Sequence, residues 1–69
     1  MRGDDHMNEL MIAVGNSYIY FKTNKTAVYD AMVEFENNMM SIGVNIDNMF
    51  WDTAVLRDVN GSDIGYMKW

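Results

Sequence analysis

One stretch with helical periodicity lies in the middle of this 69-residue chain, between Thr23 and Gly43, and the rest of the fold must be built around it. Its apolar residues recur at the spacing of one helix face. They are Val28, Ala31, Met32, Phe35, Met39 and Ile42. Thr23, Asn24 and Thr26 are candidate N-caps, and Gly43 is a C-terminal stop. One apolar stripe can cover one face of an antiparallel sheet.

The segment before the helix has the pattern of a β-hairpin. Residues 10–22 are rich in apolar and aromatic residues and turn at Gly15–Asn16, a favoured two-residue connection. This turn predicts three facing pairs on the core side, Val14 with Ser17, Ile12 with Ile19, and Leu10 with Phe21.

The segment after the helix contains a second hairpin, whose turn is the sequence DVNGSD at Asp58–Asp63. If Asn60–Gly61 alone formed the turn, Asp58 would face Asp63, and opposed like charges are unfavourable. We therefore predict a three-residue loop with Gly61 in the left-handed conformation of a bulge. In this register the facing pairs are Arg57–Asp63, Leu56–Ile64, Val55–Gly65, Ala54–Tyr66 and Thr53–Met67.

The element order ββαββ predicts a small single α+β domain over residues 7–69, in which a four-stranded antiparallel sheet carries one helix on one face. Residues 44–48 are expected to form a polar connector. Residues 1–6 have no periodicity, and His6–Met7 is the dipeptide that a common cloning site encodes. We interpret residues 1–6 as a disordered tail or a cloning remnant.

The face of the sheet without a helix should then be aromatic. The predicted registers place seven apolar or aromatic residues there, Met11, Tyr18, Tyr20, Trp51, Val55, Met67 and Trp69. Exposed patches of this kind mark interfaces, and Tyr, Trp and Met are enriched in interface cores. Three interpretations remain open: a different register that returns some of these residues to the core, a homodimer, or a different protein partner.

The net charge of −5 argues against direct nucleic-acid binding, because the five basic residues are scattered and phosphate contacts require clusters of them. An acidic surface could meet a basic groove of a protein partner, or it could serve solubility alone. The candidate acidic contact residues are Asp30, Glu34, Glu36, Asp47 and Asp52.

The sequence contains no recognisable catalytic constellation. Without Cys, and with His6 as the sole histidine, the chain cannot build a thiolate or histidine zinc site or a Cys–His pair. Its five glycines are dispersed, which excludes a glycine-rich phosphate loop. Asp47 and Asp52 provide too few acids for a convincing cation site. We expect no enzymatic activity, no cofactor and no metal.

These observations favour a non-catalytic protein-binding module. Small, acidic, cysteine-free domains are typical of phage and mobile-element accessory proteins, which suggests an inhibitor of a host nucleic-acid-handling or defence protein. The alternative is a homo-oligomeric structural or assembly protein that uses the aromatic sheet face. No apolar run is long enough for a membrane span, and the expected compartment is the cytoplasm, of the host cell if the protein is phage-encoded.

Overall fold

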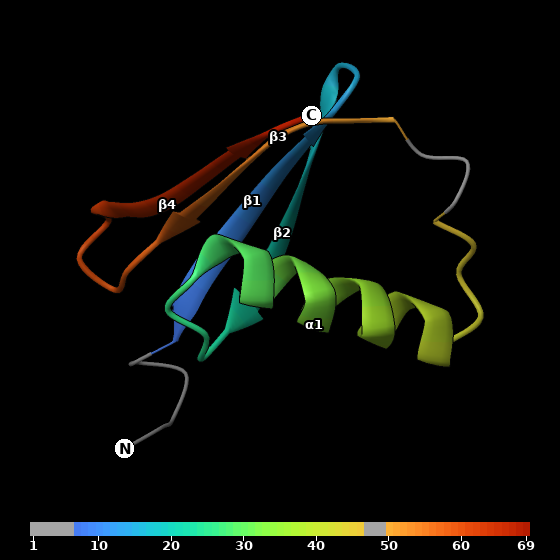
Figure 1. The fold of residues 1–69 in the computed structure, drawn as a ribbon, viewed down its shortest axis with the longest axis horizontal. Coiled ribbons are helices and arrows are strands. Elements are labelled where there is room, and N and C mark those ends of the chain that lie inside the picture. Colours follow the sequence, from blue (N-terminus) through green and yellow to red (C-terminus); the bar gives the residue numbers. More distant parts are fainter. Residues whose placement is uncertain (1–6, 47–49) are drawn as a thin grey trace.

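The computed structural model describes residues 7–46 and 50–69, which form one open antiparallel sheet and one helix (Figure 1). The elements are β1 (Asn8–Val14), β2 (Ser17–Thr23), α1 (Val28–Ser41), β3 (Trp51–Arg57) and β4 (Asp63–Lys68). The predicted ββαββ α+β fold is confirmed, and the strand order is β2-β1-β3-β4. The predicted tail at residues 1–6 and the candidate residue Asp47 lie outside the described residues.

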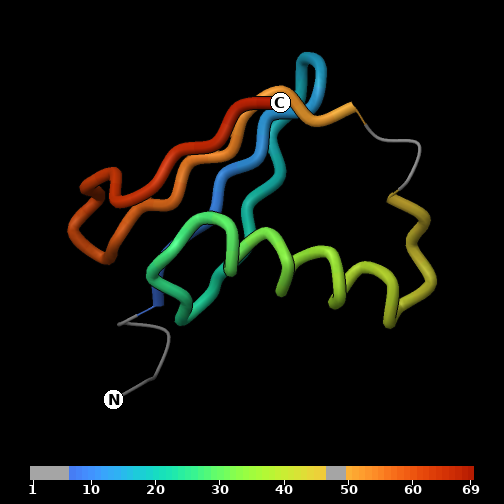
Figure 2. Tube along the Cα trace, viewed as in Figure 1, coloured from blue at the N-terminus to red at the C-terminus, as the bar shows by residue number. Residues whose placement is uncertain are grey.

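The core lies between α1 and one face of the sheet, as the helical stripe predicts. Ala31, Met32 and Phe35 are buried on the helix. They pack with residues that alternate along β1 and β3, namely Leu10, Ile12, Ala54 and Leu56. The prediction for Ile42 is wrong, since its side chain is 69% exposed. Ile42 follows the last helical residue, at the end of α1 that runs out beyond the strands (Figure 2).

The two ends of α1 are built differently. The N-cap position is Ala27, which makes no side-chain capping bond, so the predicted caps are wrong. The chain needs residues 24–27 to cross from β2 to the helix axis, which moves the start of α1 past the predicted caps. The C-terminal stop is confirmed: Gly43 has φ +85°, and its N–H donates to the Met40 carbonyl at 3.1 Å. The Val44 N–H also donates to the Met39 carbonyl at 2.9 Å, which completes a Schellman motif.

The connection from β2 to α1 is held by a chain of hydrogen bonds around the buried side chain of Thr23. The Thr23 hydroxyl donates to the Glu34 carboxylate of α1 and accepts the Lys25 N–H at 3.0 Å. The Asn8 amide at the start of β1 donates to the Lys25 carbonyl at 2.7 Å. Thr23, one of the three candidate caps, therefore fixes the helix to the sheet edge through its contact with Glu34.

Thr23→Val is expected to lower the free energy of unfolding by about 1–2 kcal/mol. Valine keeps the shape but leaves the Lys25 N–H and the Glu34 carboxylate without the hydroxyl. Urea unfolding followed by circular dichroism measures the loss, with Thr53→Val on the opposite face of the sheet as the matched control. Equal stability of the two variants would show that the hydroxyl contributes nothing.

The first hairpin has the predicted register, with Val14 opposite Ser17, Ile12 opposite Ile19 and Leu10 opposite Phe21. In the second hairpin the Arg57–Asp63 pair is confirmed, but the pairs beyond it are wrong by one residue. The ladder shifts between Leu56 and Arg57, so that Leu56 lies opposite Gly65 and Ala54 opposite Met67. The shift brings glycine under the helix, where a Cβ at position 65 would lie 2.9 Å from the Val28 Cβ.

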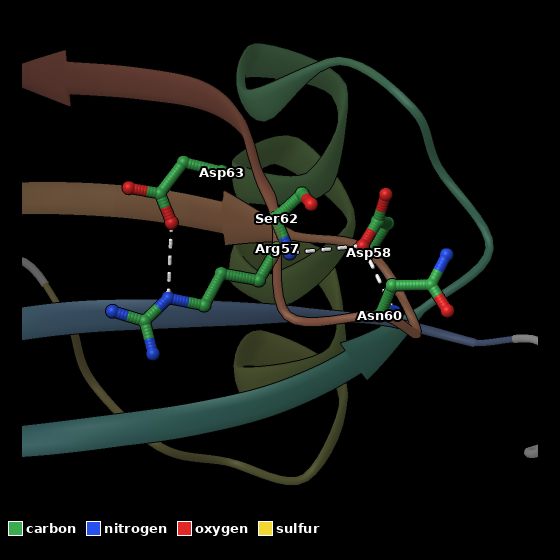
Figure 3. Close-up of polar contacts among 5 residues, drawn as sticks. All are labelled: Arg57, Asp58, Asn60, Ser62 and Asp63. Atoms are coloured by element: carbon green, nitrogen blue, oxygen red, sulfur yellow. Dashed lines mark hydrogen bonds and ion pairs between the residues drawn. The ribbon is translucent and has the colours of Figure 1, made fainter.

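The DVNGSD segment is a turn, as predicted, and its acids serve the turn itself (Figure 3). The Asp58 carboxylate accepts the N–H groups of Asn60 at 2.9 Å and Ser62 at 3.0 Å. Gly61 has φ +84°, the left-handed conformation that the three-residue loop requires. Arg57 Nε lies 3.1 Å from Asp63 Oδ1 across the strands.

One apolar residue of the predicted polar connector is buried. Ile46 is only 8% exposed. An isolated apolar residue between Asn45 and Asp47 carries no periodicity, so sequence patterns alone do not reveal its burial.

Candidate functional site

The face of the sheet that α1 leaves uncovered, hereafter the open face, is made of three cross-strand rows in the order β2, β1, β3, β4. The middle row is Tyr20–Met11–Val55–Tyr66, the charged row is Lys22–Glu9–Arg57–Asp63, and the third row is Tyr18–Ala13–Thr53–Lys68. Because successive residues of a strand point to opposite faces, all twelve lie opposite the core residues. The open face thus combines an apolar centre with a polar border.

Three tyrosines dominate the exposed area of the open face. Tyr18, Tyr20 and Tyr66 are each about three-fifths exposed, whereas Met11 and Val55 between them are half-buried. Tyrosine presents an apolar ring together with a hydroxyl that bonds to water or to a partner, which suits a surface that is wet in one state and covered in another.

The charged row is paired within the sheet. Lys22 Nζ lies 3.8 Å from Glu9 Oε2, and the Arg57–Asp63 pair lies at 3.1 Å. With Lys68 in the third row, the open face carries three of the chain's five basic residues and two acidic ones. This face is therefore locally positive by one charge in a chain with net charge −5.

Three residues predicted for this surface lie instead on the helix side of the sheet. The ladder between β1 and β3 shifts at Ala13/Val14, which places Trp51 opposite Val14, and its ring packs 6.0 Å from that of Phe35. Met67 lies opposite Ala54 and packs against the core. Trp69 is half-exposed and stacks obliquely on Trp51, with ring centroids 6.3 Å apart. Two one-residue shifts of the strand register explain these errors, because each shift moves the residues beyond it to the opposite face of the sheet.

Tyr66 belongs to the open face, but the register predicted from the sequence placed it on the opposite side of the sheet. The predicted register paired it with Ala54, whereas it lies opposite Val55. Gly65 carries the signal that could have found it, because a glycine in a strand often marks a close approach of another segment. Placing Gly65 beneath the helix puts its neighbour Tyr66 on the open face.

The four acidic residues of the predicted contact surface that the structure describes do not form one patch. Glu34 is bonded to Thr23 on one flank of α1, and Glu36, two positions on, points to the other flank. Asp52 accepts the Gly15 N–H at 3.1 Å and so holds the tip of the first hairpin. Asp30 is exposed near the start of α1. No single partner surface follows from these positions.

A shallow depression lies on the outer side of α1. Its lining is mixed, with Lys25, Tyr29, Asp30, Val33, Glu34 and Asn37. In the described part of the chain, no three His, Cys, Asp or Glu residues are grouped so that they could hold a metal ion.

Comparisons of the chain with protein-family models, with curated proteins and with solved structures find no match. The helix of residues 28–41, which is the helical part of the described chain, is neither long nor apolar enough to cross a membrane.

Proposed function

We propose that this chain is a non-catalytic protein-binding module and that the open face is its contact surface. The supporting observation is the middle row, in which Tyr20 and Tyr66 stand exposed on both sides of Met11 and Val55. A contiguous apolar and aromatic strip inside a polar border has the composition of an interface core with its rim.

The open face suits a protein partner better than a nucleic acid. Exposed aromatic rings on a sheet can stack with bases, but such surfaces track a phosphate backbone with a basic groove. Here Lys22 and Arg57 are already paired with Glu9 and Asp63. The remaining cation of this face, Lys68, is a single charge at the edge strand.

The inhibitor hypothesis stays a prediction, as does the cytoplasm as its compartment. An acidic contact with a basic groove would have to use Asp30 and Glu34 on one flank of α1, since Glu36 and Asp52 lie elsewhere. The open face offers the larger continuous surface, and the proposed function rests on it.

A comparative capture experiment tests this proposal. Wild type, Tyr20→Ser/Tyr66→Ser and the control Tyr29→Ser are immobilised, and a lysate of the source cells containing a differently tagged copy of the chain is passed over each. Tyr29 is matched because it is exposed to a similar degree on the helix. We expect wild type and the control to retain the same stoichiometric partner, and the double variant to lose it, with at least about tenfold lower recovery because tyrosine is enriched among interface hot spots.

Equal retention by all three proteins, or no retention by any, would contradict the proposal. Circular dichroism establishes beforehand that the double variant is folded, which is expected because both tyrosines are exposed.

A further inference from the structure

We infer that the partner covering the open face is a second copy of this chain, bound face to face about a two-fold axis that runs parallel to the strands. The inference rests on the proposed function, since it names the occupant of the same surface. It is carried by the order of charges in one row of the sheet.

The charged row alternates in sign from edge to edge. In the strand order β2, β1, β3, β4 it reads Lys22, Glu9, Arg57, Asp63, or plus, minus, plus, minus. A two-fold axis parallel to the strands reverses this order in the second copy while keeping each row opposite itself. An alternating row of four then meets its own complement at every position.

The facing pairs follow directly from this operation. At the centre, Glu9 of one copy meets Arg57 of the other, and the symmetry produces that pair twice. At the edges Lys22 meets Asp63, also twice. Opposite charges across an interface fix its register and exclude other arrangements.

The other two rows are compatible with the same axis. In the third row Tyr18 meets Lys68, a cation–π combination, and Ala13 meets Thr53, so large opposes large and small opposes small. In the middle row Tyr20 meets Tyr66 at both edges, where edge-to-face ring packing is available, and Met11 meets Val55 at the centre.

The competing two-fold axis, which runs across the strands, fits poorly. It would lay the charged row over the third row, so that Asp63 faces Lys68 at the β4 edge, but Glu9 faces Ala13 and Arg57 faces Thr53 at the centre. The two central charges would then lose water without gaining a partner in the second copy, which is costly. The axis parallel to the strands instead places an opposite charge of the second copy against all four charges of the row.

The size of the face predicts the strength of the association. Four strands about 4.8 Å apart and three rows about 6.8 Å apart give a flat footprint of about 20 by 20 Å, or about 400 Å² per copy. The total of about 800 Å² is below that of stable specific interfaces and is typical of weak, transient ones, so the equilibrium between monomer and dimer should depend on concentration. Stacked sheets also cross at about 30°, which keeps the central strands opposed while the edges diverge. The central Glu9–Arg57 contact is therefore the most sensitive position.

Charge reversal at that contact provides the test. Glu9→Lys alone places a new cation opposite Arg57 of the second copy, and Arg57→Glu alone places a new carboxylate opposite Glu9. Each variant should therefore self-associate at least about tenfold more weakly than wild type. In an equimolar mixture, the introduced lysine of one variant faces the introduced glutamate of the other, and the retained Arg57 faces the retained Glu9. The mixture should therefore regain the dimer.

Sedimentation equilibrium measures wild type, each variant and the mixture up to the highest soluble concentration. Glu36→Lys makes the same charge change on the helix and should dimerise like wild type. Both reversals also remove a pair within the sheet and place like charges on neighbouring strands, which is unfavourable, so thermal unfolding checks that each variant is folded. If one is not, Lys22→Glu and Asp63→Lys form the equivalent pair at the edges and replace them.

Weak self-association of each variant with recovery in the mixture supports the inference. A wild type that stays monomeric at every concentration, variants that dimerise like wild type, or a mixture that stays monomeric would each overturn it. None of these outcomes decides the proposed function, which the capture comparison tests separately. In that comparison the Tyr20→Ser/Tyr66→Ser variant can still lose a partner other than the tagged copy.

Discussion

Replacing Phe35 by alanine is expected to leave most of the chain unfolded at room temperature. Phe35 is 2% exposed, and its ring packs edge-on against Phe21 at 5.5 Å and Trp51 at 6.0 Å. Removing a buried phenylalanine costs about 3–5 kcal/mol. A domain of this size has about 3–5 kcal/mol of net stability in total, so the loss matches the whole reserve.

Circular dichroism and urea titration of Phe35→Ala check this expectation, with Tyr29→Ala as the control. Tyr29 is an aromatic residue of the same helix that is 65% exposed, so its removal should change stability by no more than about 0.5 kcal/mol. A cooperative transition for Phe35→Ala close to that of wild type would mean that the Phe21–Phe35–Trp51 ring cluster is not the centre of the core.

Local patterns in the sequence were sufficient for the elements and for the first hairpin. The stripe through Ala31, Met32 and Phe35 has only one helical interpretation, and Gly15–Asn16 fixes the facing pairs of β1 and β2 because a two-residue turn leaves no freedom in register. The bulged loop at Gly61 followed from the repulsion between Asp58 and Asp63 in the competing register.

The two register shifts do not follow from the patterns of the hairpins alone, because each depends on contacts with distant segments. The shift next to Leu56 places Gly65 beneath Val28, which is decided by the helix rather than by the hairpin. The shift at Ala13/Val14 turns Trp51 toward Phe35. Each shift moves residues between faces of the sheet. The open face therefore contains the predicted residues Met11, Tyr18, Tyr20 and Val55, lacks Trp51, Met67 and Trp69, and includes Tyr66, which was not predicted there.

The pairing of β1 with β3 could not be predicted from the sequence, although the proposed dimer depends on it. The alternation of charge in the row Lys22–Glu9–Arg57–Asp63 exists only because β1 and β3 are neighbours at the centre of the sheet. In the sequence, Glu9 and Lys22 precede the helix and the connector, whereas Arg57 and Asp63 follow them. No local pattern therefore relates Glu9 to Arg57.

Gly65→Val is expected to destabilise the fold by about 3 kcal/mol, and Gly65→Ala by about 1–2 kcal/mol, as overpacking of a filled site does. A Cβ at position 65 would lie 2.9 Å from the Val28 Cβ and 3.3 Å from the Val28 backbone nitrogen, so the first turn of α1 would have to move away from β4. Without this contact Gly65→Ala would stabilise the fold, because replacing glycine where φ allows it reduces the entropy of the unfolded chain.

A double-mutant cycle identifies the cause of that loss. Val28→Gly removes the opposing Cβ, and if the close approach is responsible, Gly65→Ala should cost at least about 0.5 kcal/mol less in the Val28→Gly background than in wild type. Urea midpoints of the four proteins measure the coupling. Additive losses of stability would mean that strand propensity causes the effect. A stabilising Gly65→Ala would show that the helix lies farther from β4 and that the register shift between Leu56 and Arg57 has another cause.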